Sequence, residues 1–119
     1  MWIVEFYKTK NNKNPVRDFI KKQGEKEIAK FIKEFELLEE KGVYLGFPFT
    51  SKIKGDDYKY LWELRIKFSS NNFRVIYFLY IKNVFVLLHA FKKKTPKIQK
   101  KELDTAKNRM IDYLKRKGE

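Results

Sequence analysis

The stretch YLWELRIKFSSNNFRVIYFLYIKNVFVLLHAF, residues 60–91, contains three apolar segments that are rich in β-branched and aromatic residues. Such segments favour β-strands. The links between them, SSNN at 69–72 and KN at 82–83, are short and polar, as in hairpin connections. The stretch therefore predicts a three-stranded antiparallel meander. Its last segment is apolar on both of its alternating faces, which predicts a central strand.

The remaining sequence predicts one further strand and three helices around this meander. We expect a strand over residues 2–7 and helices over residues 15–23, 25–41 and 96–115. Asn14 and Thr95 are expected helix caps because each precedes a proline, and Gly42 stands where a closing glycine belongs. At 119 residues the chain is expected to form a single domain, residues 1–119, of the α+β class. Its helices are expected on one face of an antiparallel sheet, with the opposite face partly open.

The composition indicates an anionic partner. Lysine and arginine total 28 against 15 acidic residues, a net charge of +13. Such a charge favours polyanions, above all nucleic acid, although a lysine-rich solvated surface is the alternative. With one histidine and no cysteine, we expect no metal site, no cofactor and no disulfide. The N-terminus resembles no signal peptide, and no apolar run approaches the ~20 residues of a membrane span, so a cytoplasmic location is expected.

Alternation along the meander predicts a polar cluster on the open face. Glu63 and Arg65 point away from the apolar side of their strand, and Arg74 is costly to bury without a partner. The apolar last strand leaves the direction of His89 undecided. If His89 faces outward, so does Lys93. Five lysines are expected near this cluster and are predicted to bind RNA: Lys52, Lys54, Lys92, Lys94 and Lys97.

This cluster has the groups needed for RNA cleavage without metal. A 2′-hydroxyl attacks the adjacent phosphate, one group takes its proton, and another protonates the leaving 5′-oxygen. His89, with a reference pKa near ~6.5, and Glu63 are candidates for proton transfer, and arginine suits the phosphate. A structural histidine and a charge-balancing glutamate are the alternatives. Phe78, Tyr80 and Phe91 are expected to offer stacking surfaces for bases.

Four motifs carry a resemblance to a known family: LWELR at 61–65, FRVIYF at 73–78, VFVLLHAFKKKTPK at 84–97 and A-x-x-R at 106–109. In this order they resemble the phage-derived branch of HigB-like toxins, within the RelE superfamily of type II toxin–antitoxin systems. The resemblance implies a RelE-like fold and a ribosome-dependent mRNA endonuclease that acts without metal and inhibits translation. It also implies a HigA-like helix-turn-helix antitoxin as partner.

The same resemblance implies individual roles. Arg74 matches the arginine that contacts the scissile phosphate in RelE-type toxins, Lys93 matches a basic residue at the end of the last strand, and Arg65 belongs to the WELR motif. On this basis Arg74→Ala is expected to remove a phosphate contact and leave the fold intact.

Two departures from RelE support a different interpretation. Leu61 and Glu63 stand where RelE has lysines, and residues 98–100 contain no counterpart of its catalytic tyrosine. The alternative is a catalytically weak or inactive RNA- or ribosome-binding module of phage or mobile-element origin. A DNA-binding protein is a third possibility, but no recognition-helix pattern is evident.

Overall fold

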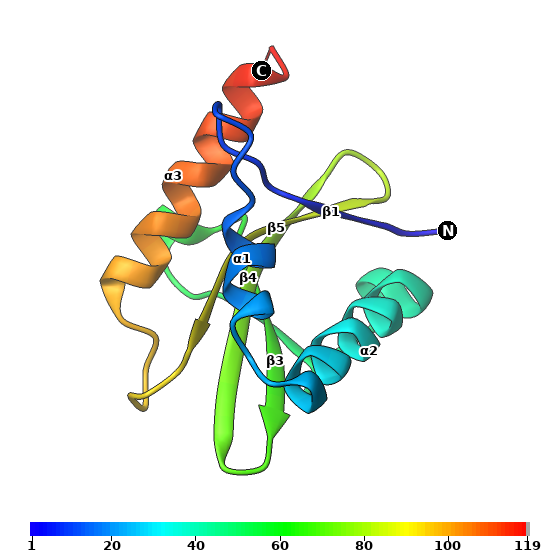
Figure 1. Ribbon diagram of the computed structural model, residues 1–119. Helices are drawn as coiled ribbons and strands as arrows, with labels where there is room; N and C mark the ends of the chain where they lie inside the picture. The colour runs from blue at the N-terminus through cyan, green and yellow to red at the C-terminus, as the bar shows by residue number, and fades with distance from the viewer. Residues whose placement is uncertain (119) are drawn as a thin grey trace.

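The computed structural model describes residues 1–118 and shows a five-stranded sheet with helices on both faces (Figure 1). Its elements are β1 (Ile3–Phe6), α1 (Pro15–Lys21), α2 (Glu25–Lys41), η1 (Gly42–Tyr44), β2 (Thr50–Lys52), η2 (Asp56–Tyr58), β3 (Trp62–Phe68), β4 (Asn71–Tyr80), β5 (Val84–Lys92) and α3 (Lys100–Arg116). Within the described chain, no helix has the length and apolar character needed to cross a bilayer.

The predicted meander and α+β class are confirmed. The strand order is β1-β5-β4-β3-β2, and β3, β4 and β5 pair antiparallel. β5 is an interior strand between β1 and β4, as its two apolar faces predict, although β4 is the middle strand. β1 pairs parallel with β5, so the sheet is mixed. β2, which the sequence did not predict, adds a short antiparallel edge to β3.

The helices α1 and α2 pack on one face of the sheet. Spacing along α2 places Phe31, Phe35 and Leu38 in the core that they share with β3 and β4. Asn14 caps α1 as predicted, since its side chain accepts a hydrogen bond of 3.1 Å from the backbone amide of Arg17. This layer buries the apolar side of β3, so the alternate residues of β3 must point to the opposite face.

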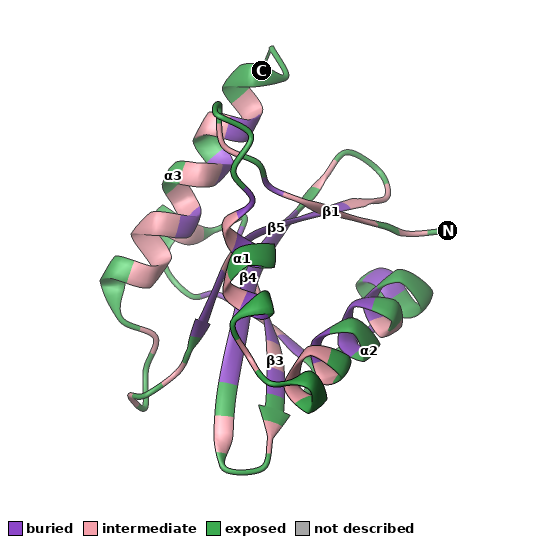
Figure 2. Ribbon diagram, in the orientation of Figure 1, coloured by how far each residue is buried: buried purple, intermediate pink, exposed green. Residues whose placement is uncertain are grey.

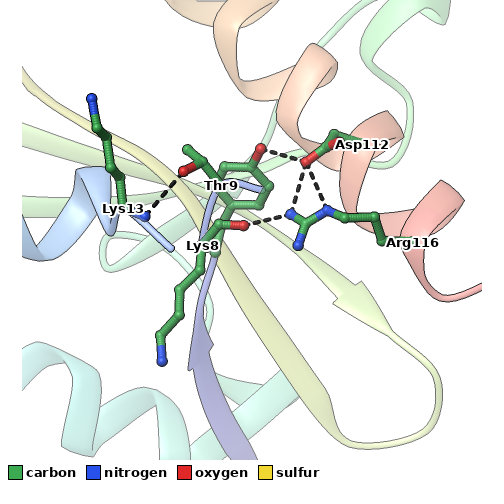
Figure 3. Close-up of polar contacts among 6 residues, drawn as sticks. Lys8, Thr9, Lys13, Asp112 and Arg116 are labelled. Carbon is green, nitrogen blue, oxygen red and sulfur yellow. Dashed lines mark hydrogen bonds and ion pairs between the residues drawn. The ribbon is translucent and has the colours of Figure 1, made fainter. Parts of the chain in front are cut away.

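The helix α3 packs on that opposite face, so the helices cover both faces of the sheet and not one face as we expected from the sequence. Ala106, Met110 and Tyr113 form a second core with β4 and β5, and Figure 2 shows both strands buried along much of their length. The end of α3 is tied to the segment after β1. There Arg116 pairs with Asp112 at 2.8 Å and donates to the Lys8 carbonyl (Figure 3). The start of α3 contacts the segment between β2 and β3, where the Tyr58 hydroxyl donates to Asp104 at 2.6 Å, and Leu103 of α3 borders an open groove beside β3.

The start of α3 differs from the prediction. The helix begins at Lys100 with Gln99 at the N-cap, so Thr95 caps no helix. The hydroxyl of Thr95 instead donates a hydrogen bond to the carbonyl of Lys97. The Thr-Pro pair therefore forms part of a loop between β5 and α3, and this loop carries several of the predicted lysines to one side of the sheet.

Candidate nucleic-acid interface

Arg65 and Arg74 are direct cross-strand partners on β3 and β4. Partners in an antiparallel pair project to the same face of the sheet. Their neighbours Leu64 and Val75 are themselves paired and lie in the core beneath α1 and α2. The two guanidinium groups therefore share the other face, and the predicted placement is confirmed.

Glu63 supplies a counter-charge for this pair of arginines. Arg74 donates from Nε to Glu63 Oε1 at 2.8 Å and from Nη1 to the carbonyl of Phe73 at 3.0 Å. The side chains of Arg74 and Glu63 are only 6% and 15% exposed. Burial lowers the pKa of Arg74, and Glu63 opposes that shift. A guanidinium this buried and paired contributes to the structure itself, so we now expect Arg74→Ala to destabilise the fold as well as to remove a cation from this face.

An open groove of about 780 Å³ runs along this arginine pair. It lies between the β2–β3 edge and the loop that joins β5 to α3. Six cationic side chains line it against one carboxylate: Lys52, Lys54, Arg65, Arg74, Lys93 and Lys97, with Glu63. We call this the basic groove. It brings together four of the five predicted catalytic residues and three of the five predicted RNA-binding lysines.

Lys93 occupies a special position in the basic groove. Its backbone amide donates to the backbone carbonyl of Asn72 at 2.7 Å, and its ammonium donates to the Pro96 carbonyl at 2.8 Å. The pKa of Lys93 is lowered, chiefly by burial and also by the charge of Arg74. A lysine with a lowered pKa gives up its proton more readily than an ordinary one, which suits a general acid.

His89 lies outside the basic groove, beneath α3. Residues 76 and 77 of β4 pair with residues 89 and 87 of β5, so Leu88 is an extra residue in a β-bulge. Leu88 belongs to the core beneath α3, and His89 meets side chains of that same helix. Beyond the bulge His89 pairs with Ile76 and Phe91 pairs with Arg74, so His89 shares the sheet face of Arg74 but lies where α3 covers that face.

Two side chains of α3 hold the His89 ring. Its Nε2 lies 2.9 Å from Glu102 Oε1, and Arg109 Nη1 lies 3.2 Å from its Nδ1. Arginine can only donate, so Nδ1 accepts and Nε2 carries the hydrogen that Glu102 receives. Burial lowers the pKa of His89, and the hydrogen bond to Glu102 opposes this shift. The network therefore holds a neutral imidazole of defined tautomer.

Other predicted residues lie elsewhere. Lys92 and Lys94 line a separate hollow of about 250 Å³ together with Lys101 and Glu102. The predicted stacking residues Phe78 and Phe91 are buried in the core beneath α3, and the Tyr80 ring packs 5.1 Å from that of Tyr113. The expectation that these three aromatics face bases is wrong for Phe78 and Phe91, because α3 covers the face to which they point.

Sequence reasoning missed three residues of interest. Glu102 and Arg109 lie seven positions apart on α3, which is two helical turns, so both can reach His89. The A-x-x-R motif contained Arg109 but indicated no partner for it. Phe47 at the rim of the groove lies in a segment without periodicity, which carries no signal for the direction of a side chain.

The mixed sheet, the helices on its faces and the closing α3 define an α+β protein compatible with the RelE-like fold. Residues 18–111 match the family described as "Phage derived protein Gp49-like (DUF891)". The chain therefore belongs to the phage-derived Gp49-like family, which is associated with RelE-like, toxin-like proteins. A search of curated proteins found no match.

Proposed function

We propose that this chain is the toxin of a type II toxin–antitoxin system, of the HigB-like kind, and that it cleaves mRNA on the ribosome. The observation that carries the proposal is the pairing of Arg65 with Arg74 in a groove with four further cations. Opposed guanidinium groups repel, and an RNA phosphate between them would relieve that repulsion. Membership of the Gp49-like family supports a toxin-like role.

The proposed reaction needs no cofactor. The 2′-oxygen of one nucleotide bonds to the adjacent phosphorus and loses its proton, the bond from phosphorus to the 5′-oxygen breaks, and that oxygen leaves with a new proton. A 2′,3′-cyclic phosphate and a 5′-hydroxyl result. Charge builds on the phosphate oxygens in the transition state, so positioned cations lower the barrier.

The groove offers a group for each task. Arg65 and Arg74 neutralise the phosphate, because a guanidinium fork pairs with two oxygens. Lys93, with its lowered pKa, donates the proton to the 5′-oxygen. Glu63, the one carboxylate in the groove, takes the proton of the 2′-hydroxyl. His89 has no part in this scheme because its ring is held beneath α3 by Glu102 and Arg109.

The proposed partners are mRNA on the ribosome and a HigA-like helix-turn-helix antitoxin. A groove with six cations and one carboxylate is complementary to an acidic segment of such a partner. We place the protein in the cytoplasm, where translating ribosomes are found.

A second candidate is a basic RNA- or ribosome-binding module that cleaves weakly or not at all. Leu61 is fully buried and Glu63 is engaged with Arg74. These are the positions at which the resemblance to RelE leads one to expect lysines. The groove would then bind the RNA backbone without completing the reaction.

Tightly controlled expression in bacteria, with mapping of mRNA 5′ ends, tests the proposal. We expect growth arrest and new 5′ ends within translated codons, both relieved by Lys93→Ala. Lys100→Ala is the matched control, because this exposed lysine pairs with Asp104 on α3 and does not line the groove. No arrest and no new ends would refute the nuclease. Salt-sensitive binding to translating ribosomes with intact mRNA would support the second candidate.

A further inference from the structure

The basic groove has an exposed aromatic ring at its rim. Phe47 is 78% exposed and lines the groove alongside Arg65 and Lys54. The guanidinium carbon of Arg65 lies 5.3 Å from the centre of the Phe47 ring, so a cation–π contact orients the ring. An exposed phenylalanine is not unusual alone. Its position beside the arginine pair is what suggests a ligand.

The loop that presents Phe47 is held at both ends. The Phe49 amide donates to the Gly46 carbonyl at 2.9 Å, and the Thr50 hydroxyl donates to the Leu45 carbonyl at 2.5 Å. The Phe49 carbonyl in turn accepts from the Arg65 amide at 2.7 Å, which ties the loop to β3. A ring on a preformed loop loses little conformational freedom when it binds, so stacking on it costs less.

Single-stranded RNA matches this combination of groups. Its phosphates suit the six cations of the groove, and each of its bases has a flat face that an aromatic ring can stack on. We infer that Phe47 is a stacking platform for one base of a single-stranded RNA whose backbone lies in the basic groove. This inference rests on the RNA-binding part of the proposed function and adds a contact with the base.

Binding of the purified full chain to short labelled RNA tests the inference. Two probes are compared at low salt: a single-stranded RNA, and an RNA of the same length with abasic sites throughout. Phe47→Ala is expected to weaken binding of the first probe roughly tenfold. It should leave binding of the abasic probe unchanged, because no base is present to stack. Phe47→Trp should retain wild-type affinity for both probes.

Tyr44→Ala is the matched control, since Tyr44 is 85% exposed but does not line the groove. The affinity of the Tyr44→Ala variant for both probes should equal that of the wild type. If Phe47→Ala lost affinity equally for both probes, the inference would be overturned, because a stacking contact cannot form with an abasic strand. Unchanged binding of both probes by Phe47→Ala would also overturn it, as expected if the ring instead contacts a protein.

A groove variant separates failure of this inference from failure of the proposed function. Lys54→Gln combined with Lys97→Gln removes two charges from the groove. If this variant weakens binding and Phe47→Ala does not, the stacking inference fails and the RNA-binding groove stands. If neither variant changes binding, both proposals fail.

Discussion

Arg65 and Arg74 face each other across β3 and β4, and within residues 1–118 only Arg74 of the two forms an ion pair with a carboxylate, that of Glu63 at 2.8 Å. Like charges at directly opposed positions destabilise a sheet. The structure keeps this arrangement by burying the ion pair of Arg74 and leaving Arg65 at the open groove. Two opposed guanidinium groups beside an open surface form an anion-binding arrangement before any ligand arrives.

The first prediction concerns the Arg74–Glu63 ion pair. Glu63→Ala leaves a buried guanidinium beside Arg65 without a counter-charge, and Arg74→Ala leaves a buried carboxylate. We expect each variant to lower the free energy of unfolding by about 3 kcal/mol. Urea denaturation measures this loss. The double variant should lose less than the sum of the two single losses, and strict additivity would show that the pair is not coupled.

The second prediction concerns proton donation by Lys93. Lys93→Arg keeps the charge but replaces a donor of lowered pKa with one that stays protonated. RNA binding should be retained while single-turnover cleavage on programmed ribosomes slows by roughly 100-fold or more. In the wild type, cleavage should fall as pH rises through the pKa of Lys93. This fall should come at lower pH than the ordinary lysine value of about 10.4. Lys94→Arg is the control, and equal cleavage by both variants would remove Lys93 from the mechanism.

The third prediction concerns the network of His89, Glu102 and Arg109. The pKa of His89 is lower in the folded chain than its unfolded value of about 6.5. The unfolded state therefore binds more protons between these two values, and stability falls as pH drops from the unfolded pKa to the folded one. Urea denaturation between neutral pH and about pH 5, above the range of ordinary carboxylates, should show this fall. In His89→Gln the fall should be reduced, and an unchanged slope would assign it to other groups.

The fourth prediction concerns the end of α2. Gly42 has a φ of +57°, and an added Cβ would lie 1.9 Å from the Trp2 ring. We expect Gly42→Ala to lower the free energy of unfolding by about 2 kcal/mol or more, through backbone strain and displacement of Trp2. Gly46→Ala is the control, because a Cβ at Gly46 meets nothing within 4 Å. Comparable losses in the two variants would exclude the contact with Trp2 as the cause.

Much of the fold could be predicted from local patterns. Hairpin-length links, apolar segments and helical spacing predicted the meander and the extents of α1 and α2 to within a few residues. Alternation along β3 and β4 correctly placed Glu63, Arg65 and Arg74 on one face, because successive side chains of a regular strand point to opposite faces. Each of these features depends on neighbours that are close in the sequence.

The sequence by itself determined the α+β class, the net positive charge and the shared face of the two arginines. Only the tertiary structure decided that His89 lies apart from them. His89 pairs with Ile76 and therefore lies on the same face of the sheet as Arg74, but the docking of α3 covers its ring there with Glu102 and Arg109. The same docking buries Phe78 and Phe91 and leaves Phe47 at the rim of the groove. These outcomes depend on contacts between segments that are distant in sequence. The periodicity of a single segment does not indicate which face of the sheet a distant helix will cover.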